Sequence, residues 1–147
     1  MILRKIIAAA AVASLATMAI ADDDPRHVRH ELMEDVRDAA KVVGAMLKGE
    51  RDYDQAAAMG SLKTWEGVAE QFGGLFPEGS ETGEDTEAAP AIWEDRAGFD
   101  AALQDWQDAV GTALAANAAT LDDARPLLGA VMKTCKGCHD KYRIESE

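Results

Sequence analysis

The chain has 147 residues, of which 27 are Asp or Glu and 15 are Lys or Arg, so its formal net charge at neutral pH is −12. Such a surface repels nucleic acid and anionic membranes, which argues against a protein that binds either one and favours a basic partner protein. The length suffices for one domain with a hydrophobic core and is short for two.

The first residues have the pattern of an exported protein. Two basic residues precede an apolar run from Ile6 to Ile20, and Ala19-Ile20-Ala21 is a small-x-small cleavage pattern. We therefore predict that residues 1–21 form a signal peptide that is cleaved on export to the periplasm. An uncleaved membrane anchor is the weaker alternative, because the run is shorter than the ~20 residues of a membrane span. Cleavage removes two basic and no acidic residues, so the mature charge is 13 − 27 = −14.

The first half of the mature chain predicts two helices. From residue 25 to 48, apolar residues recur three, four or seven positions apart, which is a helical period. Gly49 follows, where a helix C-terminus favours glycine. The same period predicts a second helix over 53–72. Residues 73–90 are rich in Gly, Pro, Glu and Thr and lose the period, so we predict one long connection there.

The second half predicts two more helices. One covers 92–117, and the last begins after the turn at 121–123, has Pro126 in its first turn and continues through the cysteines to the C-terminus. No stretch shows the alternation of a β-strand. Four amphipathic helices predict an all-α fold, an antiparallel four-helix bundle that forms one domain over residues 22–147.

The last predicted helix carries Cys135-Lys136-Gly137-Cys138-His139. On a helix, residues i, i+3 and i+4 share one face. Two thiols one turn apart can add to the two vinyl groups of a haem, and the adjacent imidazole can then reach the iron. We therefore predict one covalent haem c per chain, attached at Cys135 and Cys138, with His139 as the axial iron ligand.

Three other interpretations of the cysteines are weaker. A zinc site could add His27 and His30, but structural zinc usually organises a domain without its own core, and we expect both histidines to be exposed. A thioredoxin-like dithiol would follow a strand, and none is predicted. A disulfide across two intervening residues would be strained.

The sequence resembles class II cytochromes c, specifically the cytochrome c′ family. The resemblance covers the mature chain and is carried by residues 135–143, by Arg29-His30-Glu31-Leu32-Met33, and by Leu75-Phe76-Pro77 and Pro90-Ala91-Ile92-Trp93. It implies a haem between the helices with five-coordinate, high-spin iron that binds nitric oxide or carbon monoxide. It also implies exchange of electrons with partner proteins, no enzyme activity, and a homodimer formed through the first two helices.

Met33 is the residue on which the function depends. It matches the family position that covers the distal face of the iron, where apolar side chains usually stay unbound. Low-spin relatives bind a methionine there, so the alternative is a His/Met electron carrier with Met33 as sixth ligand. Met33 could also simply fill the core. A peroxidase is disfavoured, because no distal acid–base residue is expected near Met33.

Further residues receive roles from the resemblance. Arg29, one turn before Met33, matches an arginine that approaches a haem propionate, where it could pair bidentately; otherwise it is a solvated charge. Arg143 matches a basic residue on the proximal side, and otherwise complements the helix dipole. Phe72 matches a ring near the distal pocket, or is ordinary core. The remaining candidates near the haem are His30, Thr86 and Glu87; Trp65, Trp93 and Trp106 are expected in the core or at a bundle end.

Overall fold

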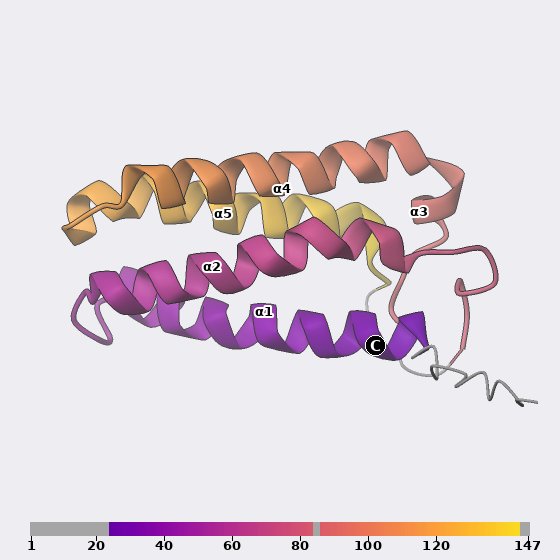
Figure 1. Cartoon of the computed structure of the whole chain (residues 1–147), viewed down its shortest axis with the longest axis horizontal. Helices are drawn as coiled ribbons and strands as arrows, with labels where there is room; N and C mark the ends of the chain where they lie inside the picture. Colours follow the sequence, from indigo (N-terminus) through magenta and orange to yellow (C-terminus); the bar gives the residue numbers. More distant parts are fainter. Residues whose placement is uncertain (1–23, 84–85, 145–147) are drawn as a thin grey trace, which may run out of the picture.

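The computed structural model describes residues 24–83 and 86–144, and the predicted signal peptide lies outside them. Four long helices run antiparallel, each beside the next in the chain (Figure 1). Within the described ranges there is no β-strand, which confirms the predicted all-α four-helix bundle, and no helix there is both long and apolar enough to cross a membrane. The elements are α1 (Pro25–Lys48), α2 (Gln55–Phe72), the 3-10 turn η1 (Gly73–Leu75), α3 (Ala91–Glu94), α4 (Arg96–Ala116) and α5 (Leu121–Tyr142).

Side-chain caps explain where the helices begin and end. Gly49 ends α1 in the left-handed conformation, as predicted, with φ 74°. Thr120 caps α5, because its hydroxyl accepts a hydrogen bond from the Asp123 amide. The helix therefore begins at Leu121, and the prediction that Pro126 lies in the first turn was wrong: Pro126 lies in the second turn.

The predicted helix over 92–117 is divided at Asp95, which has non-helical dihedral angles. Its carboxylate accepts a hydrogen bond from the Gly98 amide at 3.1 Å and so caps α4. The same carboxylate lies 2.5 Å from the Lys141 ammonium on α5. α3 is thus a separate turn at the end of the bundle, and α4 begins where α5 ends.

The core lies along the bundle axis, where each long helix buries its apolar stripe. Trp65 and Trp106 are buried in it, as predicted, and Trp93 is half-buried on α3. The Trp65 indole N–H donates to the Val36 carbonyl at 3.1 Å and so ties α2 to α1. The largest fully buried side chains are those of Trp65, Phe99, Met46, Ile92, Leu128, Val43, Val110 and Val131.

The helices do not pack equally on one another. α1 packs closely on α2, and α4 on both α2 and α5, whereas α1 and α5 meet at few places. One is at the far end, where the Arg125 guanidinium donates to the Leu47 carbonyl at 2.8 Å. Met33 lies fourteen residues before Leu47, and His139 lies fourteen after Arg125. Since both helices rise by ~1.5 Å per residue and run antiparallel, Met33 is level with His139.

Candidate haem site

The cysteines lie in the last turns of α5. Both are half-buried and both are free thiols. The Cys135 thiol donates to the Val131 carbonyl at 3.5 Å, one turn earlier, and Cys138 packs against the hydrophobic core. Two thiols one turn apart therefore point inward from one helix, which is the arrangement that two thioether bonds to one haem require.

Burial determines the protonation of this motif. It raises the pKa of the Cys138 thiol to about 11, with a contribution from Cys135, and it also raises the pKa of Cys135. Both are neutral thiols at neutral pH. The His139 ring is partly exposed, yet contact with protein and then the Arg143 charge lower the pKa of His139, while Glu87 and Asp140 act in the opposite direction. The neutral imidazole that can bind iron is therefore favoured.

α1 forms the opposite wall of the site. Met33 is half-buried and packs against the core, level with His139. Leu32 beside it is also half-buried. An apolar thioether thus lies on the wall opposite the imidazole, on a helix that touches α5 at few places.

Arg29 lies one turn before Met33 and is 5% exposed. Burial lowers its pKa, but a guanidinium stays charged at any physiological pH. Its central carbon lies 4.6 Å from the centroid of the Phe76 ring. Four neutral oxygens of residues 73–90, hereafter the connection, accept its hydrogen bonds: the Leu75 carbonyl at 2.9 Å and Ser80 Oγ at 3.0 Å from Nη1, and the Ser80 carbonyl and Thr86 Oγ1, each at 2.9 Å, from Nη2.

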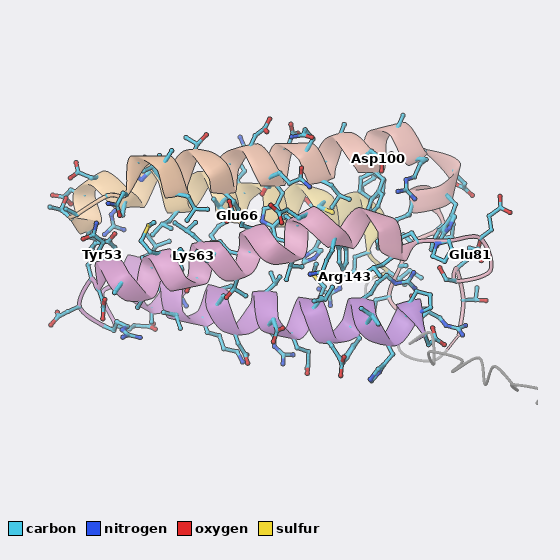
Figure 2. The ribbon with its side chains drawn as sticks, viewed as in Figure 1. Tyr53, Lys63, Glu66, Glu81, Asp100 and Arg143 are labelled. Carbon is cyan, nitrogen blue, oxygen red and sulfur yellow. The ribbon has the colours of Figure 1, made fainter. Side chains whose placement is uncertain are left out.

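Arg143 follows the last turn of α5 and is joined to the end of the connection. Its Nε donates to Glu87 Oε2 at 2.7 Å, and an isolated antiparallel bridge links Ala88 to Arg143. The Ile144 amide also donates to the Glu87 carbonyl at 2.7 Å. In Figure 2, the labelled Arg143 is seen between the α1 and α2 ribbons. The structure therefore brings Thr86 and Glu87 to the site, between Arg29 and Arg143.

The other two candidate residues are Phe72 and His30. Phe72 is buried and packs edge-on against Phe76, with ring centroids 5.2 Å apart, in an aromatic cluster that continues to Phe99. His30 is exposed, and its ring lies 3.9 Å from the Glu34 carboxylate. Phe72 is thus a core ring in contact with the Phe76 ring beneath Arg29, whereas His30 is a surface histidine.

Sequence reasoning missed Ser80 and the role of Phe76. Ser80 is 3% exposed and both of its oxygens bind Arg29. Nothing in the polar connection marks one serine as buried, because the burial depends on an arginine about fifty residues earlier. Phe76 could have been singled out from the sequence, because it is an aromatic residue within a stretch rich in Gly, Pro and Glu.

Two buried indole N–H groups lack a hydrogen-bond acceptor in the part of the chain that the structure describes. Trp93 Nε1 and Trp106 Nε1 have no hydrogen-bond partner among the described residues, and such groups are rare in proteins. Trp93 packs edge-on against Phe76, the ring beneath Arg29, at 5.8 Å between centroids. The Trp93 donor and the buried cation, both in contact with Phe76, suit a cofactor that carries carboxylates.

The residues of the zinc alternative do not come together. Among the described residues, no three His, Cys, Asp or Glu side chains gather where they could hold a metal ion. His27 instead lies 3.3 Å from the Glu31 carboxylate, one turn along α1. The two inward thiols, the level thioether and the carboxylate-binding groups fit a haem instead.

Comparison with known proteins shows the family of the chain. A family model described as Cytochrome C' matches residues 24–143. Cytochrome c′ from Rhodopseudomonas palustris is 37% identical over 130 residues, covering 86% of each chain. Cytochrome c-556 from the same organism is 31% identical over 145 residues, covering 96% of this chain and 97% of the relative.

Solved structures share the fold. The structure of R. palustris cytochrome c′ has a TM-score of 0.80 at 34% identity and covers 84% of this chain and 98% of its own. A ferrous variant of cytochrome c prime from Alcaligenes xylosoxidans with bound NO has a TM-score of 0.74 at 28% identity, covering 84% and 95%.

A four-helix bundle with a C-x-x-C-H motif in its last helix defines a class II c-type cytochrome. The chain belongs to the cytochrome c′ family, and its cofactor is covalently bound haem c with iron.

Proposed function

We propose that this chain is a periplasmic cytochrome c′ that binds nitric oxide or carbon monoxide and exchanges electrons, rather than an enzyme. Cys135 and Cys138 would hold the haem through thioether bonds, and the His139 imidazole would bind its iron. When bound, the haem iron supplies a one-electron couple and a position for a diatomic ligand. The NO-bound relative from A. xylosoxidans supports the gas-binding part.

The protein side chains supply orientation, shielding and charge. The lowered pKa of His139 keeps its imidazole neutral. Met33 covers the opposite wall with an apolar group and excludes water. Both terminal nitrogens of Arg29 already donate to the connection. We therefore propose that Arg29 attracts a propionate through its charge and its Nε–H, instead of the bidentate pairing expected from the sequence.

The observation that carries the haem part of this proposal is the pair of inward thiols beside His139 on α5, and the NO-bound relative supports the gas-binding part. The test is the absorption spectrum of the purified holoprotein, oxidised and reduced, with and without carbon monoxide. We expect a high-spin ferric spectrum and a shift when carbon monoxide binds the reduced protein. A low-spin ferric spectrum with a thioether-to-iron charge-transfer band would refute the five-coordinate site.

The second candidate is a low-spin electron carrier with Met33 as sixth ligand. The relative named cytochrome c-556 and the equal level of Met33 and His139 favour it. Met33→Leu separates the two candidates, because leucine has no iron-binding atom. A carrier should lose its low-spin spectrum, whereas a gas-binding protein should keep its coordination.

Export and assembly belong to the same proposal. Residues 1–21 are cleaved, so the mature protein should begin at Asp22, which N-terminal sequencing would verify. The homodimer would form through α1 and α2, and sedimentation would give its mass. A groove of about 520 Å³ lies between these two helices and is lined by Asp35, Asp38, Ala39, Val42, Gly60, Ser61 and Thr64.

A further inference from the structure

We propose that residues 86–88 form a clasp that holds α1 apart from the end of α5 and thereby keeps Met33 off the iron. This inference rests on the proposed haem site and concerns what selects five coordination over six. Thr86 and Glu87 would be positioning residues, since they act through the two helices rather than on the haem.

The first half of the clasp is the bond between α1 and Thr86. Thr86 Oγ1 accepts from Arg29 Nη2 at 2.9 Å and from the Ala88 amide at 3.3 Å. Arg29 is itself held by three more bonds and by the Phe76 ring. The clasp is therefore anchored to a buried side chain one turn from Met33.

The second half joins the next residue to α5. Glu87 Oε2 accepts from Arg143 Nε at 2.7 Å, one turn after His139. An exposed ion pair alone contributes little. Here the backbone adds two bonds, from the Ile144 amide to the Glu87 carbonyl at 2.7 Å and from the Ala89 amide to the Tyr142 carbonyl at 3.0 Å. This half therefore has a fixed geometry.

These two sets of bonds place residues of the connection between α1 and the end of α5. Arg29 reaches Thr86 from α1, and Arg143 reaches Glu87 from α5, so two neighbouring residues lie between the helix ends. At the other end of the same pair of helices, Arg125 binds Leu47 directly and nothing of the connection intervenes. The clasp thus acts as a spacer at the level of Arg29 and Arg143, one turn beyond Met33 and His139, and loosening it would let the thioether approach the iron.

The test uses Thr86→Val, which removes the acceptor and keeps the side-chain shape, and Glu87→Gln, which removes the charge of the ion pair. Both are made in the full holoprotein. The low-spin share of the ferric spectrum should rise. The rate of carbon monoxide association with the reduced protein should fall in proportion to the low-spin share of the ferrous spectrum: if Met33 binds half of the ferrous iron, the rate falls about twofold, because only the open fraction reacts.

Two controls separate the clasp from other effects. Glu78→Gln makes the same charge change in the same connection and should leave spin state and rate as in the wild type. In a Met33→Leu background, neither clasp variant should change the spin state, because the thioether is gone. An effect that persists in that background would overturn the clasp.

The outcomes also separate this inference from the proposed function. A high-spin wild type whose clasp variants keep its spectrum and carbon monoxide rate refutes the clasp alone. A wild type that is already low-spin through Met33 refutes both, since no spacer then keeps the thioether away. Circular dichroism of each variant reports whether the bundle is intact, and a change of spin state in an intact bundle supports the clasp.

Discussion

Arg29 is a buried cation whose four hydrogen-bond acceptors are all neutral. Buried charges usually pair with a carboxylate, because desolvation is costly. Here two backbone carbonyls, two hydroxyl groups and the Phe76 ring stabilise the charge in place of a carboxylate. Asp24 and Glu81 act on the guanidinium only through their charge, without a hydrogen bond. The arrangement makes one side chain the anchor of a long polar segment.

Arg29→Leu should destabilise the holoprotein, because it leaves buried carbonyls of Leu75 and Ser80 without donors. We expect a loss of about 1–3 kcal/mol, measured by urea unfolding. Arg37→Gln is the matched control, since Arg37 is an exposed arginine on the same helix that pairs with Glu34. Its effect should stay within about 0.5 kcal/mol. Equal stability of the two variants would argue against a structural role of Arg29.

At the scale of elements, the sequence predicted those features that depend on local sequence patterns. The four apolar stripes, the stop at Gly49 and the inward face of Cys135 and Cys138 follow from periodicity and local backbone preference. The break at Asp95 does not, because Ile92 and Phe99 keep a seven-residue spacing across it. That break depends on Lys141, a residue 46 positions later. The contacts of Arg29 could not be predicted either, because they are made with the connection, whose sequence has no helical periodicity.

Asp95 should make the stability of the α4–α5 junction depend on pH. Lys141, and then the Gly98 amide, lower the pKa of Asp95. The folded state therefore binds fewer protons than the unfolded state at acid pH. The stabilisation is complete above the unfolded value of about 3.9 and is lost as the pH falls through the lower folded pKa. Asp95 likewise raises the pKa of Lys141, so the pair persists until the pH passes above that raised value.

Asp95→Asn tests this dependence. The wild type should exceed the variant in thermal midpoint at neutral pH, and the difference should shrink below about pH 4. Asp105→Asn, an exposed substitution on the same helix, serves as the control for loss of one negative charge. A difference between wild type and Asp95→Asn that stays constant from neutral to acid pH would contradict the prediction.

At the scale of the whole molecule, charge is unevenly distributed. The mature chain carries −14, but α1 has five basic and four acidic residues and α5 has four basic and three acidic. The two walls of the proposed haem site therefore carry 9 − 7 = +2, and the rest of the mature chain carries −16. A redox partner that docks near the haem would meet a different charge from the one that net composition suggests.

This distribution predicts which lysines control electron transfer with a small anionic oxidant such as hexacyanoferrate(III). At about 0.1 M salt the Debye length is about 10 Å, so charges near the haem dominate the encounter. Lys136 is exposed beside Cys135, whereas Lys63 is exposed on α2 (Figure 2). Lys136→Glu and Lys63→Glu change the net charge equally. We expect Lys136→Glu to slow oxidation of the reduced holoprotein several-fold and Lys63→Glu to leave the rate nearly unchanged, by stopped-flow absorbance.

Ionic strength provides the internal check on that comparison. At about 0.01 M salt the Debye length grows to about 30 Å, and the full negative charge then repels the oxidant in both variants. Both rates should therefore fall as salt is lowered, with Lys136→Glu the slower, and the two rates should converge at about 1 M salt, where the Debye length is only about 3 Å. Equal rates at every salt concentration would mean that net charge alone governs the encounter. In that case we would expect a basic partner, as the net composition suggests, rather than a partner that recognises the face formed by α1 and α5.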